Sequence, residues 1–174
     1  MAGCIHTCCF TGSRPEKMTF NYQKEPYQME ALRRDLRAAI LRAADAGCTD
    51  FISGMSRGFD LWAAEEVLAL RDTRPDLNLI CAIPFSGQAH AWDEAWRALF
   101  SRLVHAVPPQ NVRVLSPAYY RGCFHDRDRY MVDQASRVIC WYTGAPGGTQ
   151  YTYRYARRMG REIENLAASQ LTFY

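Results

Sequence analysis

The sequence has no long apolar run. No stretch of about 18 apolar residues occurs, so no membrane span is expected. Its first residues, Met-Ala-Gly-Cys-Ile-His, lack a charged start followed by an apolar segment, so no secretory signal is expected either. We therefore predict a cytoplasmic protein that does not enter a membrane.

The sequence also lacks cysteines and histidines at the spacing typical of metal ligands. The chain has 7 cysteines, but no Cys-x-x-Cys pair and no histidine at ligand spacing beside them. Most lie in apolar runs, such as those around Cys81 and Cys140, and free cysteine behaves as a small buried hydrophobe. We predict reduced, buried thiols, no metal site and no required cofactor.

A strong charge of one sign is absent too. Lys and Arg number 21 against 18 Asp and Glu, which gives a net charge of +3. That balance suits an anionic ligand but falls short of a dedicated nucleic-acid binder. The 174 residues, 48% of them hydrophobic, fit a single domain over 1–174 with its own core.

Short apolar runs alternate with amphipathic stretches along the chain. Runs bounded by Gly or Pro are typical of buried strands, and they predict strands at 5–10, 50–53, 77–83, 112–115 and 138–142, with a short last strand at 162–166. Periodic apolar residues predict helices at 29–43, 59–70, 92–103, 123–135 and 149–158. This alternation predicts an α/β, Rossmann-like, three-layer domain with a mostly parallel sheet flanked by helices.

Ligands of open α/β sheets bind at the carboxyl ends of the strands, so the loops there are the candidate site. The first strand is followed by Thr11, Gly12, Ser13 and Arg14. Small residues let backbone N–H groups approach an anion, and an Arg can clamp a phosphate. A tight turn with a surface Arg is the alternative interpretation.

The second strand leads into a loop with Gly54, Ser56 and Gly58, and Asp60 follows in the next helix. Glycines and serines before a helix favour phosphate binding at the helix N-terminus. The loop is not a Walker motif, because no Gly-Lys-Ser/Thr follows. Asp60 has a simpler alternative role as a helix cap or first-turn acid.

The third strand is followed by Pro84, Phe85 and Gln88. Phe85 or Trp92 could stack on a base or close a pocket. Trp92 also begins the apolar stripe of its helix, so a core position is the alternative, whereas Trp96 is assigned to the core.

Two further segments complete the candidate site. Arg127 shares a helix face with Met131 and could reach a ligand phosphate, the alternative being a solvated charged face. The most specific feature follows the fifth strand, where a glycine turn presents consecutive N–H groups and a hydroxyl for a phosphate or ribose phosphate. The residues of that turn are Gly144, Gly147, Gly148 and Thr149.

Together these segments resemble the YpsA-like branch of the SLOG superfamily, which also includes the Lonely Guy phosphoribohydrolases and the DprA/Smf proteins. The resemblance rests on the segments 9–15, 54–65, 84–88, 127–133 and 142–152, in that order. It implies a Rossmann-like fold and a nucleotide-type ligand such as ADP-ribose or an NAD-related molecule. It also implies a link to bacterial cell division or stress signalling, and a homodimer is plausible for this superfamily.

The chain departs from these relatives at two places. Ser13 stands where the first loop usually has a His, and Gln150 and Tyr151 follow Thr149 where the Lonely Guy hydrolases carry glutamates. Arg127 matches the Arg of the hydrolases' Arg-Lys-x-x-Met segment. The phosphate-binding half of the site is therefore retained and the catalytic half altered.

The loops at the strand ends are compatible with three functions. A ligand-binding sensor explains the phosphate loops and the missing glutamates. The alternative is an N-glycoside hydrolase, for which Asp60 and Asp133 are the weak catalytic candidates, while Glu65 lies too deep in its helix. Single-stranded DNA binding, as in DprA, ranks last because the Arg cluster of the first helix is more simply a solvated surface. The expected partner is a small nucleotide ligand; a protein partner stays open and nucleic acid is not expected.

Overall fold

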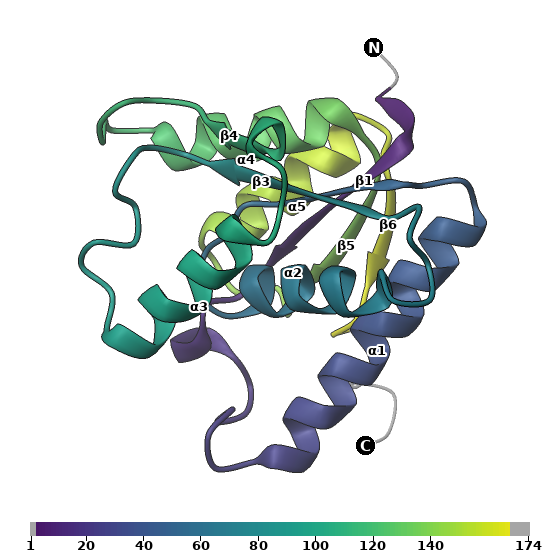
Figure 1. The fold of residues 1–174 in the computed structure, drawn as a ribbon, viewed down its shortest axis with the longest axis horizontal. Helices are drawn as coiled ribbons and strands as arrows, with labels where there is room; N and C mark the ends of the chain where they lie inside the picture. The colour runs from purple at the N-terminus through teal and green to yellow at the C-terminus, as the bar shows by residue number, and fades with distance from the viewer. Residues whose placement is uncertain (1–2, 168–174) are drawn as a thin grey trace.

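The computed structural model describes residues 3–167, and its strands form a single six-stranded sheet (Figure 1). The order across the sheet is β4-β3-β2-β1-β5-β6, and every pairing is parallel. The strands are β1 (Cys4–Gly12), β2 (Asp50–Ser53), β3 (Asn78–Ile83), β4 (Val112–Val114), β5 (Ala135–Trp141) and β6 (Glu162–Asn165). The predicted α/β class is confirmed, and the sheet is parallel throughout.

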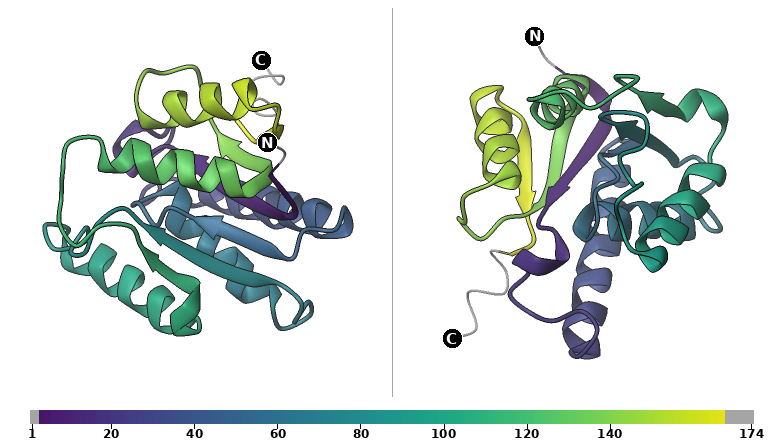
Figure 2. Two further views of the ribbon diagram at one scale, coloured as in Figure 1. Left: turned by 90° about the horizontal axis from the view of Figure 1, so that it is seen from above. Right: turned by 90° about the vertical axis from the view of Figure 1, so that its left-hand side faces the viewer.

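Five helices connect the strands and cover the two faces of the sheet (Figure 2). They are α1 (Pro26–Asp45), α2 (Phe59–Leu70), α3 (Glu94–His105), α4 (Cys123–Gln134) and α5 (Gly148–Arg158). Since strands β1 to β4 run outward in order, right-handed crossovers put α1, α2 and α3 on one face. The chain then returns to the other side of β1, so α4 and α5 lie on the opposite face, completing three layers.

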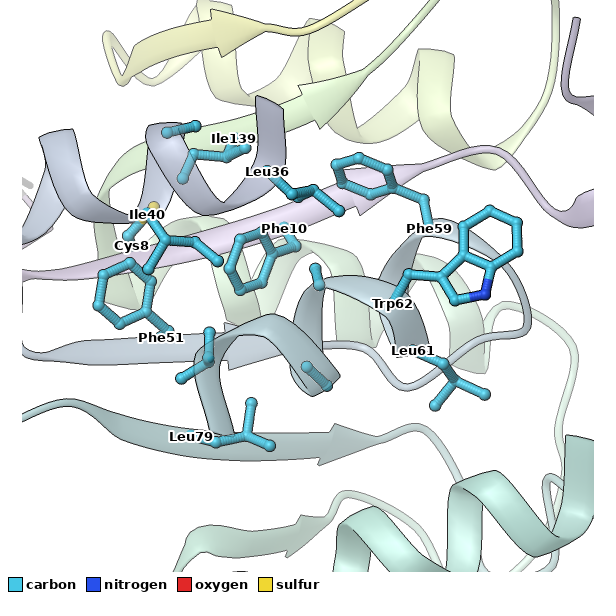
Figure 3. Packing of buried hydrophobic residues seen from close by; sticks show 14 of the residues in the cluster. Cys8, Phe10, Leu36, Ile40, Phe51, Phe59, Leu61, Trp62, Leu79 and Ile139 are labelled. Atoms are coloured by element: carbon cyan, nitrogen blue, oxygen red, sulfur yellow. The ribbon is translucent and has the colours of Figure 1, made fainter. Parts of the chain in front are cut away.

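The larger core lies between the sheet and α1 to α3 (Figure 3). Phe10 of β1 and Phe51 of β2 stack with ring centroids 6.0 Å apart. Leu36 and Ile40 of α1, four residues apart and fully buried, belong to the same cluster. Helix α2 is buried on most sides because it packs against β1 to β3 and between α1 and α3, which explains its weak amphipathic pattern.

Several element boundaries differ from the predicted ones for local reasons. Helix α1 begins at Pro26 rather than at Met29, since proline is favoured at the first helical position. Helix α3 begins after Asp93, whose side chain accepts a hydrogen bond from the Trp96 N–H at 3.1 Å. Trp92 therefore precedes the helix and packs edge-on against Phe100.

Two predictions about buried side chains can be compared with the structure. Trp96 is buried against the core, as predicted. Six of the seven cysteines are buried free thiols, but Cys4 at the start of β1 is exposed, so the prediction of burial is wrong there. Among residues 3–167, no helix combines the length and apolar character that crossing a membrane requires.

The strand order creates a crevice at the carboxyl ends of β1 and β5. These neighbours are the point where the connections change direction, because the chain leaves β1 toward β2 and leaves β5 toward β6. Loops that diverge from adjacent parallel strands leave the space in which open α/β sheets bind ligands.

Candidate functional site

A cavity of about 360 Å³ opens in this crevice, a size within the usual range of small-molecule sites. Four segments supply its walls: the loop after β1, the start of α2, the first turns of α4 and the loop before α5. The lining residues are Thr11, Gly12, Ser13, Arg14, Lys17, Ser56, Asp60, Phe124, His125, Arg127, Asp128, Tyr142, Thr143, Ala145, Pro146, Gly147, Gly148 and Thr149.

Glycines allow the loop after β1 and the start of α2 to meet beside the cavity. A Cβ at Gly12 would lie 2.3 Å from Cγ of Phe59, so only glycine permits this approach. Gly58 has a φ of +89°, which favours glycine, and a Cβ there would lie 2.7 Å from the carbonyl oxygen of Ser13. The Phe59 N–H donates to that same carbonyl at 3.2 Å. Gly58 thus shapes the wall without lining it.

Asp60, in the first turn of α2, has an unusual carboxyl group. Asp60 is only 6% exposed, yet it lines the cavity. Its Oδ1 atom has no hydrogen-bond partner within the described part of the chain. Burial raises the pKa of Asp60 from its ordinary 3.8 to about 7, while the Arg127 guanidinium lowers it and Asp128 raises it further. Near neutral pH this carboxyl can therefore donate or accept a hydrogen bond.

Arg127 is held from several sides. Its Nε donates to Oδ1 of Asp128 at 2.8 Å, Nη1 donates to the carbonyl oxygen of Gly54, and Nη2 donates to Oγ of Ser56 at 3.4 Å. A guanidinium has five N–H donors, so part of it stays available to the cavity that it lines. Arg127 therefore anchors the loop after β2 to α4, a role that the sequence does not predict. A Cβ at Gly54 would lie 2.7 Å from its Nη1, so Gly54 makes room for it.

The N-terminus of α5 is suited to an anion. Its N-cap, Gly147, has a φ of +141° and provides no side-chain cap. The first N–H groups of a helix have no acceptor within the helix, and the helix dipole adds partial positive charge. Gly148 and Thr149 carry these groups to the cavity wall. Lys17 lies beside the N-cap, because a Cβ at Gly147 would be 3.1 Å from its Nζ.

Most of the predicted ligand-binding residues meet in this cavity. They are Thr11, Gly12, Ser13, Arg14, Ser56, Asp60, Arg127, Gly147, Gly148 and Thr149. This meeting is a matter of position, and their role in binding stays a prediction.

The remaining predicted residues lie outside the cavity lining. Pro84, Phe85 and Gln88 follow β3, which is two strands away from β1. The Gln88 Nε2 donates to the Met55 carbonyl at 2.9 Å and so holds the loop after β2. The two glycines Gly54 and Gly58 shape neighbouring turns, and Gly144, at a φ of +92°, serves the turn after β5. Asp133 is exposed and accepts a hydrogen bond from the Tyr155 hydroxyl at 2.7 Å, away from the cavity, so the geometry does not support a catalytic role for it.

Several lining residues are not predicted from the sequence. Lys17 is the last residue of a short 3₁₀ turn (Pro15–Lys17) and lines the cavity. Phe124 and His125 begin α4, and the Arg14 guanidinium lies 5.7 Å from the centre of the Phe124 ring. A basic residue shortly after a strand-end turn is the only sequence signal for Lys17. The α4 residues have none, since their position depends on the crossover from β4 to β5.

The fold is similar to that of two solved DprA structures. DprA from Helicobacter pylori, for which a single-stranded DNA binding mode is described, has a TM-score of 0.59 at 17% identity, over 95% of this chain and 70% of that one. DprA from Streptococcus pneumoniae has a TM-score of 0.57 at 16% identity, over 90% of this chain. The matched part is 48% of the Streptococcus chain, so this chain spans about half of it. At these identities the likeness shows the fold alone.

Curated relatives carry the UPF0398 name. The protein from Bacillus thuringiensis (strain Al Hakam) is 25% identical over 158 residues, which cover 89% of this chain and 84% of the relative. UPF0398 protein BH1768 from Halalkalibacterium halodurans is 24% identical over 128 residues, covering 73% of this chain and 68% of that protein. The model of the YpsA family, described as the YspA SLOG family, matches residues 8–174. The chain therefore belongs to this SLOG family.

Proposed function

We propose that the cavity between β1 and β5 binds a small phosphorylated ligand of the nucleotide type. The observation that carries the proposal is the uncapped N-terminus of α5, which meets Arg14 and Lys17 around one cavity. Backbone N–H groups, a helix dipole and two cations form a typical environment for a phosphate.

The wall of the cavity at the start of α2 suits the ribose of such a ligand. Hydroxyl groups need partners that donate and accept, and Asp60 can do either near neutral pH. The Ser56 hydroxyl and the Thr11 side chain line the same space. A phosphate at α5 with its sugar toward α2 would thus find a partner at each end.

We further propose that the domain acts as a sensor of nucleotide derivatives such as ADP-ribose or NAD-like molecules. The glutamates that serve the Lonely Guy hydrolases are absent after Thr149, so binding without turnover accounts for the residues present. The family resemblance extends this role to bacterial cell division or stress signalling.

Calorimetric titration with ADP-ribose, AMP, ribose 5-phosphate and an uncharged sugar tests the proposal. Gly148→Asp places a carboxylate at the anion site, and Gly148→Ala is its matched control, because a Cβ there meets nothing within 4 Å. We expect saturable binding of the phosphorylated ligands, at least tenfold weaker binding by the Asp variant, and unchanged binding by the Ala variant. Equal binding by both variants, or no saturation with any ligand, would refute the phosphate site.

A second candidate function is hydrolysis of an N-glycosidic bond. The observation that favours it is the buried carboxyl of Asp60 in the cavity wall. A carboxyl with a pKa of about 7 can protonate a leaving base or activate a water. Chromatography of the titrated samples would detect released base. Release by wild type but not by Asp60→Asn would support hydrolysis, and intact ligand in every sample would leave binding as the function.

Single-stranded DNA binding gains no support from the basic face of α1. Arg33 pairs with Glu65 and Glu66 at 2.9 and 3.1 Å, and Arg37 pairs with Glu66 at 3.0 Å. Charges neutralised in this way do not form the open basic groove that a nucleic acid needs. Glu65 is thereby assigned a structural role, as its place in α2 predicts.

A further inference from the structure

Three aromatic side chains form a cluster beside the cavity, which we call the aromatic ledge: Phe85, Tyr119 and Phe124. Phe85 meets Tyr119 edge-on at 5.5 Å between ring centroids and Phe124 edge-on at 6.0 Å. The rings of Tyr119 and Phe124 are 6.4 Å apart and inclined at 56°. Phe124 also lines the cavity, so the ledge continues the cavity wall outward.

Tyr119 is the exposed member of the ledge, although its loop is anchored. Tyr119 is 63% exposed, whereas aromatic rings usually have much of their surface covered. The segment before it is fixed by hydrogen bonds from the Leu115 N–H to the Ile83 carbonyl at 2.9 Å and from the Ser86 N–H to the Ser116 carbonyl at 3.0 Å. An exposed ring on an anchored segment is preorganised for a flat ligand, because little ordering is left to occur on binding.

A positive charge beside the ledge indicates which kind of ligand would cover the aromatic rings. The Arg14 guanidinium lies 5.7 Å from the centre of the Phe124 ring, so the cation expected to hold a phosphate also touches the ledge. A ligand that joins an anionic group to a flat heteroaromatic ring satisfies the cavity and the ledge at once. A simple sugar phosphate would leave the ledge uncovered.

We infer that the aromatic ledge stacks the base of the nucleotide whose phosphate lies at the N-terminus of α5. This inference rests on the proposed function and deepens it, because it assigns the residues that hold the base of the nucleotide. Tyr119 provides the exposed ring, Phe124 connects it to the cavity, and Phe85 contacts both rings edge-on. Stacking reads the flat face of the base and tolerates different bases.

Titration with two probes that differ only in the base tests the inference. AMP and ribose 5-phosphate share the sugar and the phosphate, so the ratio of their affinities reports the base alone. We expect wild type to bind AMP about tenfold or more tightly than ribose 5-phosphate. Tyr119→Ala should lose most of that advantage without changing the affinity for ribose 5-phosphate, and Tyr119→Phe should keep it because it keeps the ring.

Each result separates the inference from the proposed function. Equal affinities of wild type for the two probes would overturn base stacking while the phosphate site stands. Equal weakening of both probes by Tyr119→Ala would assign Tyr119 a structural role and also overturn the inference. If neither probe binds, the proposed function fails, and base stacking fails with it.

Discussion

Replacement of Asp60 by asparagine should stabilise the protein at neutral and alkaline pH but much less at acidic pH. The carboxyl is 6% exposed, and burial raises its pKa from 3.8 to about 7. Between these two values the folded protein holds a proton that the unfolded chain has released. Stability therefore falls as pH rises through this window, and it levels off above pH 7.

The size of the effect follows from the width of the window. Each pH unit within it costs about 1.4 kcal/mol of unfolding free energy. From pH 5 to pH 7 wild type should lose about 2 kcal/mol relative to Asp60→Asn, because the folded carboxyl is already half ionised at pH 7. Asparagine has nearly the same shape and cannot ionise, so it removes the cost of a buried charge while filling the same space.

Urea unfolding followed by tryptophan fluorescence at pH 5, 6, 7 and 8 measures this difference. All other ionisable groups are common to both proteins, so their contributions cancel in the comparison. Asp133→Asn is the matched control, because Asp133 is an exposed carboxylate on α4 and its variant should follow wild type. Parallel curves for wild type and Asp60→Asn would refute the argument that Asp60 is costly to ionise.

Three further predictions concern the frame of the site. Gly12→Ala should lower the unfolding free energy measured in urea by about 1–3 kcal/mol, because the alanine Cβ would lie 2.3 Å from buried Phe59. An unchanged unfolding free energy would contradict the close approach of the two residues. Asp128→Ala should lower the unfolding free energy by about 3–5 kcal/mol, because it leaves buried Arg127 without the carboxylate that pairs with it. Asp128→Asn should lower it less, and equal losses in the two variants would show that the charge is unimportant. In the native protein only Cys4 should react rapidly with a thiol reagent, because the other six thiols are buried and burial raises the pKa of Cys9, Cys81 and Cys140 among them. All 7 thiols should react after denaturation, and several fast thiols before denaturation would contradict the prediction.

The layered fold is predictable because each strand and helix carries its own signal. The bounds of β2 and α2 match the predicted 50–53 and 59–70, since a glycine-rich loop separates the two elements. Strand β5 begins at Ala135 rather than at 138, because its first residues pair with β1 although they do not form an apolar run. Pairing of this kind depends on the neighbouring strand and leaves no local pattern.

The candidate site is predictable only in part, because its composition depends on the order of the strands. The loops after β1 and β5 meet since these strands are neighbours, and their glycines mark them in the sequence. His125 lies at the cavity because the crossover from β4 passes over the sheet to β5. No feature of the sequence near His125 indicates that crossing.

Phe85 shows how strand order decides where a predicted site residue lies. The sequence predicts that it stacks on a base or closes a pocket, because an aromatic ring follows the third strand. The order β4-β3-β2-β1-β5-β6 places β3 two strands from β1, so Phe85 does not reach the cavity. Its ring contacts Tyr119 and Phe124 edge-on instead. If the ledge stacks a base, Phe85 acts through those two rings, and Phe85→Leu should weaken AMP binding less than Tyr119→Ala does while leaving ribose 5-phosphate binding unchanged.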